Sequence, residues 1–202
     1  MSSPSPLPDA SLGSETSARR NAVQLWLVLF LGLLAVDQVV KAWARWAADW
    51  TEGRSIHALW PGVFELKLVY NEGIAFGMLQ GHGVWLTPIA VVIALFAFAF
   101  SWKHPHENKW THVGMAVLAS GAVGNLIDRL WMQKVTDMFW IRAINFPVFN
   151  IADVCITVAA ALLGVIWVRE SAQAMRESRR ASVEADANPS SRAPATEPDP
   201  AE

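Results

Sequence analysis

The sequence predicts an all-α membrane protein, a bundle of four transmembrane helices with a small outer β-sheet and disordered termini. Three observations lead to this fold class. The 202-residue chain is 53% hydrophobic and 17% charged, with 11 Trp and a mean hydropathy of +0.27, which is too apolar for an ordinary soluble domain. Four apolar stretches approach the roughly 20 residues that a membrane-spanning helix needs. The two ends of the chain are polar and rich in Ser and Pro or in charge.

The four apolar stretches follow one another with short polar connections. They run from 21 to about 43, from 84 to 102, from 111 to 127 and from 149 to 168. The first carries Asp37 and Lys41 in its second half, and the second carries no charge. The third is rich in Gly, Ala and Ser, which let neighbouring helices approach closely. Residues 21–169 are therefore expected to form one membrane domain.

A loop and strand region at 46–83 is expected to lie outside the membrane. Residues 63–68 alternate between apolar and polar side chains, as a half-buried strand does, and Asn71-Glu72-Gly73 is typical of a turn. We therefore predict a small outer sheet. The Trp and Gly content of the stretch from 46 to 61 suggests a lid that moves over the site. Residues 1–20 and 170–202 are predicted to be disordered cytoplasmic tails because they cannot bury enough apolar surface.

Positive charge in the short flanking segments predicts the orientation. One side of the membrane receives Arg19, Arg20, Lys103, Lys109, Arg169, Arg176, Arg179 and Arg180. Cytoplasmic flanks carry the excess of Lys and Arg, so both termini are expected in the cytoplasm.

Composition also argues against several classes of partner. A net charge of −2 gives no sign of a nucleic-acid partner. The single Cys155 cannot form an intrachain disulfide or a Cys-rich metal site. His104, His106 and His112 are only a weak metal signal, so neither a metal nor a cofactor is expected.

The most informative motif is a repeated tetrad, Asn125-Leu126-Ile127-Asp128 and Asn150-Ile151-Ala152-Asp153. A carboxylate at the edge of hydrocarbon is costly unless it is paired, protonated or hydrated, which makes two of them candidates for function. In each tetrad Asn precedes Asp by three residues, so both side chains share one helix face. The two Asp residues lie at the same outer end of consecutive antiparallel helices, and we predict that Asp128 and Asp153 converge there.

Two carboxyls in a site of low dielectric constant share one proton near neutral pH. Such a pair suits peptide hydrolysis, since the ionised member can take a proton from water while the protonated member binds the scissile carbonyl. Asn125 and Asn150 would orient the carboxyls. Asp37 lies at a similar depth and is expected to form an i,i+4 ion pair with Lys41 that braces the site.

Several alternatives stay open. A proton-coupled transporter would also carry intramembrane carboxylates, a serine-type intramembrane protease could use Ser120, and a structural scaffold would need none of these groups. Taken singly, Asp128 could ion-pair with Arg129, Asp137 could be a solvated loop acid, and Asn71 could cap its turn.

Five blocks in order resemble the motif set of bacterial lipoprotein signal peptidase, also called signal peptidase II. They are Asp37-Gln38-Val39-Val40-Lys41, Asn71-Glu72-Gly73-Ile74-Ala75-Phe76, Gly124-Asn125-Leu126-Ile127-Asp128-Arg129, Val135-Thr136-Asp137-Met138-Phe139 and Phe149-Asn150-Ile151-Ala152-Asp153. The resemblance covers about residues 25–168. One departure is the block at 141–147, which lacks the Gly- and Trp-bearing form typical of the family.

The resemblance implies a four-helix aspartic endopeptidase of the bacterial inner membrane, with its active site near the periplasmic face. It implies cleavage of prolipoproteins just before a diacylglyceryl-modified cysteine, without a cofactor, by an enzyme that contacts membrane lipid and is expected to be a monomer. On this pattern Asp128 and Asp153 form the catalytic dyad. The supporting residues are Asp37, Lys41, Asn71, Asn125, Arg129, Asp137 and Asn150.

Overall fold

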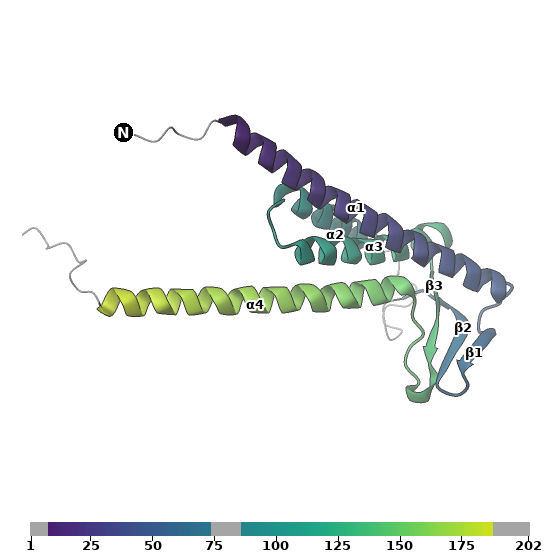
Figure 1. Cartoon of the computed structure of the whole chain (residues 1–202). Coiled ribbons are helices and arrows are strands. Elements are labelled where there is room, and N and C mark those ends of the chain that lie inside the picture. Colours follow the sequence, from purple (N-terminus) through teal and green to yellow (C-terminus); the bar gives the residue numbers. More distant parts are fainter. Residues whose placement is uncertain (1–7, 74–85, 188–202) are drawn as a thin grey trace, which may run out of the picture. The chain divides into compact units, whose positions relative to one another are not determined.

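The computed structural model describes residues 8–73 and 86–187, and these are mostly helical with one small sheet (Figure 1). The elements in chain order are α1 (Pro8–Ala47), β1 (Ser55–Trp60), β2 (Phe64–Asn71), α2 (Leu86–Lys103), α3 (Lys109–Met132), β3 (Val135–Ile141), the 3-10 helix η3 (Arg142–Ile144) and α4 (Ile151–Ala187). The chain divides into two compact units, residues 1–163 and residues 164–202. The first unit holds the sheet and every candidate site residue.

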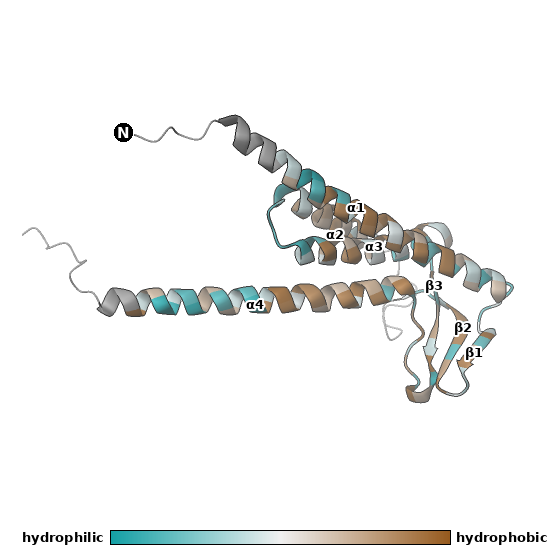
Figure 2. Ribbon diagram, in the orientation of Figure 1, coloured by the Kyte–Doolittle hydropathy of each residue, from teal (hydrophilic) through white to brown (hydrophobic). Residues whose placement is uncertain are grey.

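Within residues 8–73 and 86–187, three helices are long and apolar enough to cross a membrane. The stretches concerned are Thr16–Ala47, Lys109–Met132 and Ile151–Val183, and a shorter apolar helix covers Thr87–Lys103. Figure 2 shows hydrophobic residues along the middle of α1 and the first part of α4, with hydrophilic residues following in the second part of α4. Large apolar side chains such as Val28, Val92 and Val158 are exposed on the helices, as expected of surfaces that face lipid.

The two longest helices extend beyond the predicted spans. Residues 8–20 belong to α1 and residues 170–187 to α4, in place of the disorder predicted there. Adding residues to a helix that is already formed is much easier than starting one. Pro8 suits the first helical position, and the Ala, Glu and Arg of 170–187 favour helix. The remaining parts of the two predicted tails lie outside the described residues, as does the start of the second predicted span.

Small residues let the helices of the first unit pack closely, as the sequence predicts. Trp26 of α1 packs in one cluster with Ala97 of α2 and with Ala116 and Ala119 of α3. At Gly124 of α3, a Cβ atom would lie 2.6 Å from the carboxylate of Asp37. The crossing of α1 and α3 therefore leaves no room for a larger residue where the polar site begins.

The sheet has the order β1-β2-β3, with antiparallel neighbours. Strand β2 fulfils the predicted strand, whereas β3 was not predicted. Gln133 ends α3 in the left-handed conformation (φ 61°), and the chain turns directly into β3. Pairing of Asn71 with Val135 and of Val69 with Asp137 brings the end of β2 beside the start of β3. The sheet thereby carries Asp137 to the end of the helix bundle.

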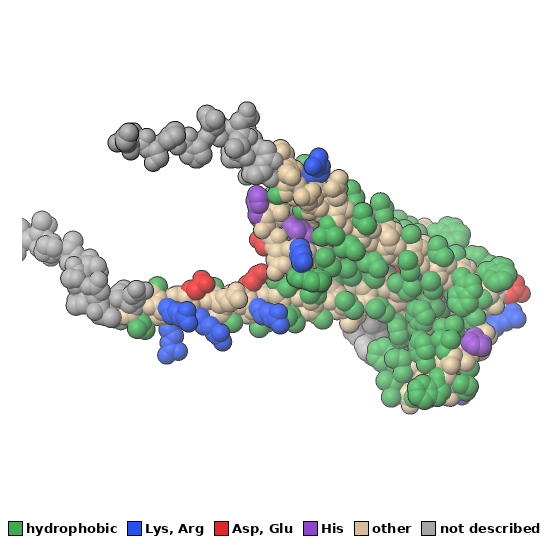
Figure 3. Space-filling view, in the orientation of Figure 1, with side chains coloured by type: hydrophobic (Ala, Val, Ile, Leu, Met, Phe, Trp, Pro, Cys, Tyr) green, Lys and Arg blue, Asp and Glu red, His purple; other side chains and the backbone are tan. Residues whose placement is uncertain are grey.

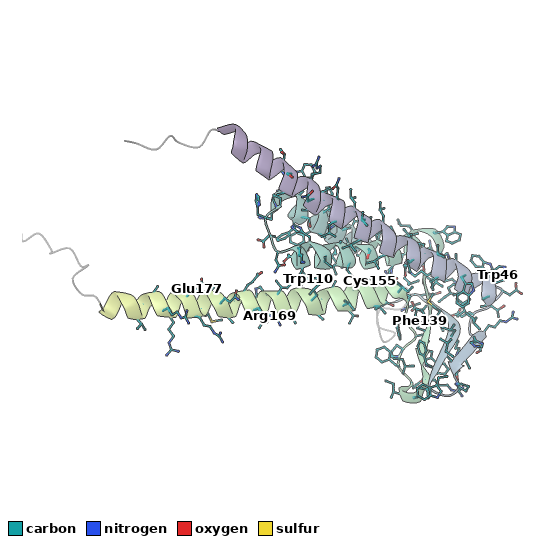
Figure 4. The ribbon with its side chains drawn as sticks, in the orientation of Figure 1. Trp46, Trp110, Phe139, Cys155, Arg169 and Glu177 are labelled. Carbon is teal, nitrogen blue, oxygen red and sulfur yellow. The ribbon has the colours of Figure 1, made fainter. Side chains whose placement is uncertain are left out.

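Hydrophobic side chains cover most of the face of the first unit that Figure 3 presents. Several Trp side chains are exposed near the sheet end, where α1 and α3 finish and β1 ends: Trp43, Trp46, Trp50, Trp60 and Trp131. Figure 4 shows Trp46 at the end of α1 beside the sheet. Amphipathic aromatic rings of this kind are typical of a membrane–water interface.

Candidate active site

Asp137 of β3 and Asp153 of α4 line one cavity of about 1210 Å³ in the first unit, together with the exposed Glu52 and Glu72. Its polar wall also includes Asn71, Asn125 and Arg129. The apolar wall comes from three helices and includes Ile89, Ala90, Ile93, Ala122, Ile156 and Val158. In Figure 4, Phe139 marks the strand that carries Asp137 and Cys155 marks the beginning of α4. The cavity thus places the carboxyls of Asp137 and Asp153 beside an apolar surface.

Asp153 is held at the first turn of α4 by reciprocal capping. Asn150 Oδ1 accepts from the Asp153 backbone N–H (2.9 Å), and Asp153 Oδ2 accepts from the Asn150 backbone N–H (3.2 Å). Asn125 Nδ2 of α3 donates to Asp153 Oδ1 (2.8 Å). Both carboxylate oxygens therefore accept hydrogen bonds at the N-terminus of α4, and these bonds fix the orientation of the carboxyl group.

Asp137 is almost completely buried and favours the protonated form. Asn150 Nδ2 and Asn71 Nδ2 donate to its two oxygens (2.6 and 3.2 Å). Burial, followed by the negative charge of Asp153, raises the pKa of Asp137 from 3.8 to about 7. Asp137 is thus the member of the pair that can carry a proton near neutral pH.

Lys41 of α1 sets the orientation of Asn125. Its Nζ lies 2.9 Å from Asp37 Oδ2, which confirms the predicted i,i+4 ion pair, and it donates to Asn125 Oδ1 at 3.0 Å. Asn150 Nδ2 donates to the same Asn125 oxygen (3.0 Å). With its oxygen held from two sides, Asn125 presents its Nδ2 to Asp153. Asn125 therefore serves the carboxyl of the second tetrad and not that of its own.

Asp128 has a different environment from the one predicted. Its side chain has no exposed surface and lies 3.5 Å from Lys41 Nζ and 3.3 Å from Arg45 Nη1. The backbone N–H of Thr136 donates to its second oxygen (2.9 Å). Asp128 is absent from the described residues that line the cavity. The structure thus brings Asp153 together with Asp137, because α3 continues past Asp128 and β3 then returns to the cavity.

The other predicted site residues lie around the pair. Asn71 Oδ1 caps its turn by accepting from the Gly73 backbone N–H (3.0 Å), so Asn71 both closes the turn and contacts Asp137. Asp37 Oδ1 accepts from the Ala152 backbone N–H (2.9 Å), which joins α1 to the start of α4. Arg129 is a half-buried cation in the cavity wall. Neither Arg45 nor Thr136 was predicted to be a site residue. The spacing of Asp37, Lys41 and Arg45, four residues apart on one helix face, could have indicated Arg45.

The structure also shows the surroundings of Ser120 and Cys155, and whether the described residues contain a metal-binding cluster. Ser120 Oγ donates to the backbone carbonyl of Val117 (2.8 Å), a local helix contact that offers no base. The described residues contain no group of three or more His, Cys, Asp or Glu placed to hold a metal ion. Cys155 is a buried free thiol packed near Gly121 of α3.

Comparison with known proteins gives a consistent result. The model of the family described as "Signal peptidase (SPase) II" matches residues 29–169. The lipoprotein signal peptidase of Gloeobacter violaceus is 38% identical over 157 residues, which is 78% of this chain and 88% of that protein. The lipoprotein signal peptidase of Lactococcus lactis is 37% identical over 140 residues, 68% of this chain and 88% of that protein. A solved bacterial membrane enzyme superposes with a TM-score of 0.66 at 26% identity, covering 73% of this chain and 90% of its own. The chain belongs to the signal peptidase II family, a family of proteases embedded in the membrane.

Proposed function

We propose that this protein is a membrane aspartic endopeptidase that removes the signal peptide from diacylglyceryl-modified prolipoproteins by cutting just before the lipidated cysteine. The observation that carries the proposal is the pair Asp137 and Asp153 in one cavity with an apolar wall. A signal peptide is an apolar segment, and its hydrolysis needs an acid and a base at the scissile bond. Membership of the signal peptidase II family supports this substrate class.

In the proposed reaction Asp153 is the base and Asp137 is the acid. Asp153 takes a proton from water as the water oxygen attacks the scissile carbonyl carbon, while Asp137 gives its proton to the carbonyl oxygen. When the tetrahedral intermediate collapses, the C–N bond breaks, Asp153 gives its proton to the leaving amine and Asp137 regains one from the hydroxyl group. The products are a carboxylic acid and an amine, and no acyl-enzyme forms.

The assignment of Asp137 as partner of Asp153 replaces the dyad expected from the repeated tetrads. Asp128 contacts two cations, Lys41 and Arg45, and lies outside the described cavity lining, so it lacks the access to substrate that a catalytic acid needs. We assign Asn125 and Asn150 to orienting the two carboxyls. Arg129 and Asn71, on the cavity wall, are placed to bind the substrate backbone.

We further propose four membrane spans in the bacterial inner membrane, with both termini cytoplasmic and the site near the periplasmic face. Helix α2 has 18 residues and no charge before Lys103, so it is about 27 Å long, close to the roughly 30 Å of hydrocarbon. The exposed Trp side chains near the sheet support an interface at the end of the bundle that holds the dyad. A monomer is sufficient, because the first unit contributes every residue of the proposed site.

The proposed substrate enters from the bilayer, because a lipidated signal peptide is itself a membrane segment. The apolar cavity wall from α2, α3 and α4 is suited to this segment, and the acyl chains stay in the surrounding lipid. A transporter is less well supported, because Asp37 and Asp128 are neutralised by Lys41 and Arg45 and do not mark out a path across the membrane.

The test incubates the purified full-length enzyme in detergent with each of two precursors and compares their cleavage. A prolipoprotein with the diacylglyceryl group on its cysteine is expected to lose its signal peptide, with product masses that place the cut immediately before that cysteine. The same precursor with this cysteine replaced by Ser, and therefore without lipid, is expected to stay uncut. Absence of cleavage of the lipidated precursor, or equal cleavage of both, would refute the proposed function.

A further inference from the structure

Arg45, in the last turn of α1, is buried next to the strand that carries Asp137. Its Nη1 donates to Thr136 Oγ1 (2.8 Å) and lies 3.3 Å from Asp128 Oδ1. The other Asp128 oxygen accepts from the Thr136 backbone N–H (2.9 Å). Arg45, Asp128 and Thr136 therefore form a closed set of contacts, the Arg45 clamp, that links α1, α3 and β3.

Two Trp rings cover the clamp. The guanidinium carbon of Arg45 lies 5.6 Å from the ring centroid of Trp50 and 5.2 Å from that of Trp131. Both rings are exposed on the surface, whereas only 4% of Arg45 is exposed. The rings thus stand between the guanidinium and solvent, and they stabilise it by cation–π contact. Because the rings exclude water, the local dielectric constant is low, and the attraction between Arg45 and Asp128 is stronger.

The clamp holds the residue directly before Asp137. Side chains of neighbouring residues in a strand point to opposite faces of the sheet. Thr136 points toward Arg45, and Asp137 points into the cavity, where Asn150 donates to it. Because Thr136 is held through both its backbone N–H and its hydroxyl group, the backbone position of Asp137 is fixed from behind.

We infer that Arg45 is a positioning residue, which sets the reach of Asp137 toward the scissile carbonyl through Asp128 and Thr136. The inference rests on the proposed function. It also gives Asp128 a role that is not catalytic, as the anion that aligns Arg45 with Thr136. Lysine would keep the charge at position 45, but its ammonium group lacks the planar guanidinium that lies against the rings of Trp50 and Trp131.

The inference predicts a loss in kcat with little change in KM. Arg45→Gln is expected to lower kcat by about 100-fold, the effect of misplacing a reacting group by about 1 Å, and to leave KM within about twofold. Arg45→Lys should fall between Arg45→Gln and wild type. Arg54→Gln is the matched control, because Arg54 is exposed and pairs with the exposed Asp49; it should behave as wild type.

Thr136 gives a test that does not depend on how Arg45 variants fold. Thr136→Val keeps the shape but removes the hydroxyl group, and it should lower kcat about tenfold or more in protein that still folds. Thr136→Ser keeps the hydroxyl group and should restore kcat to within about twofold of wild type. A merely structural contact would change stability without this pattern of loss and rescue.

The outcomes separate the two proposals. If wild type fails to cut the lipidated precursor, the proposed function fails and the role of Arg45 falls with it. If wild type cuts, and folded Arg45→Gln or Thr136→Val cuts with the wild-type kcat, only the inference about Arg45 is overturned. Equal losses in Thr136→Val and Thr136→Ser would overturn it as well.

Discussion

Replacing Asp137 or Asp153 by Asn is expected to lower kcat by about 10³-fold or more, since each carboxyl transfers a proton in the reaction. Asn is close in size to Asp and keeps a hydrogen-bonding side chain, so both variants should fold and still bind precursor. Single-turnover cleavage of the lipidated precursor measures the loss, and co-purification with uncut precursor measures binding. Asp49→Asn is a suitable control because its side chain is 87% exposed and lies outside the described cavity lining.

The same experiment decides between the two possible partners of Asp153. Asp128→Asn is expected to lower mainly the stability of the protein and the positioning of Thr136, because the Asp128 carboxylate contacts Lys41 and Arg45 in the protein interior. It should therefore retain more activity than Asp137→Asn. If Asp137→Asn cut at the wild-type rate while Asp128→Asn was inactive but folded, the dyad would be Asp128 and Asp153.

Lys41→Met is expected to lower the free energy of unfolding by about 3–5 kcal/mol, the range found when one partner of a buried ion pair is removed. Lys41 is completely buried, and its Nζ lies 2.9 Å from Asp37 Oδ2 and 3.5 Å from Asp128 Oδ2. Its loss therefore removes a positive charge that both buried carboxylates contact. A denaturant titration in detergent, followed by tryptophan fluorescence, measures the change in the free energy of unfolding.

Two further variants show whether charge is the cause. Arg54→Met breaks an exposed pair and should cost less than about 1 kcal/mol. Adding Asp37→Asn to Lys41→Met removes one of the stranded charges and should recover part of the lost stability. A Lys41→Met protein as stable as wild type would show that the buried charges do not depend on one another.

Local features of the structure were predictable from the sequence. The membrane class follows from apolar stretches, and the ion pair of Asp37 with Lys41 follows from helical spacing alone. The strand around residues 63–68 follows from alternation, and the close packing of α3 from its Gly and Ala content. Each of these depends on residues that are near one another in sequence.

The partner of Asp153 was not predictable in the same way. The tetrads suggested Asp128 because Asp128 lies near the end of one predicted helix and Asp153 near the start of the next, at the same depth. Which carboxyl reaches the cavity depends on how the chain returns after α3, through the left-handed Gln133 and strand β3. Asn125 likewise donates to Asp153 of the second tetrad and not to Asp128 of its own, and this contact joins residues far apart in sequence.

Hydrolysis by this pair requires a proton on Asp137, and the pH dependence of kcat/KM shows whether this proton is needed. The pKa of Asp137 is raised to about 7, and its protonated form is the active one, so kcat/KM should be high below that pH and fall as pH rises through it. The small residual rate of Asp137→Asn should lack this fall. A wild-type kcat/KM that stays level from about pH 5 to about pH 9 would show that hydrolysis does not depend on a proton of Asp137.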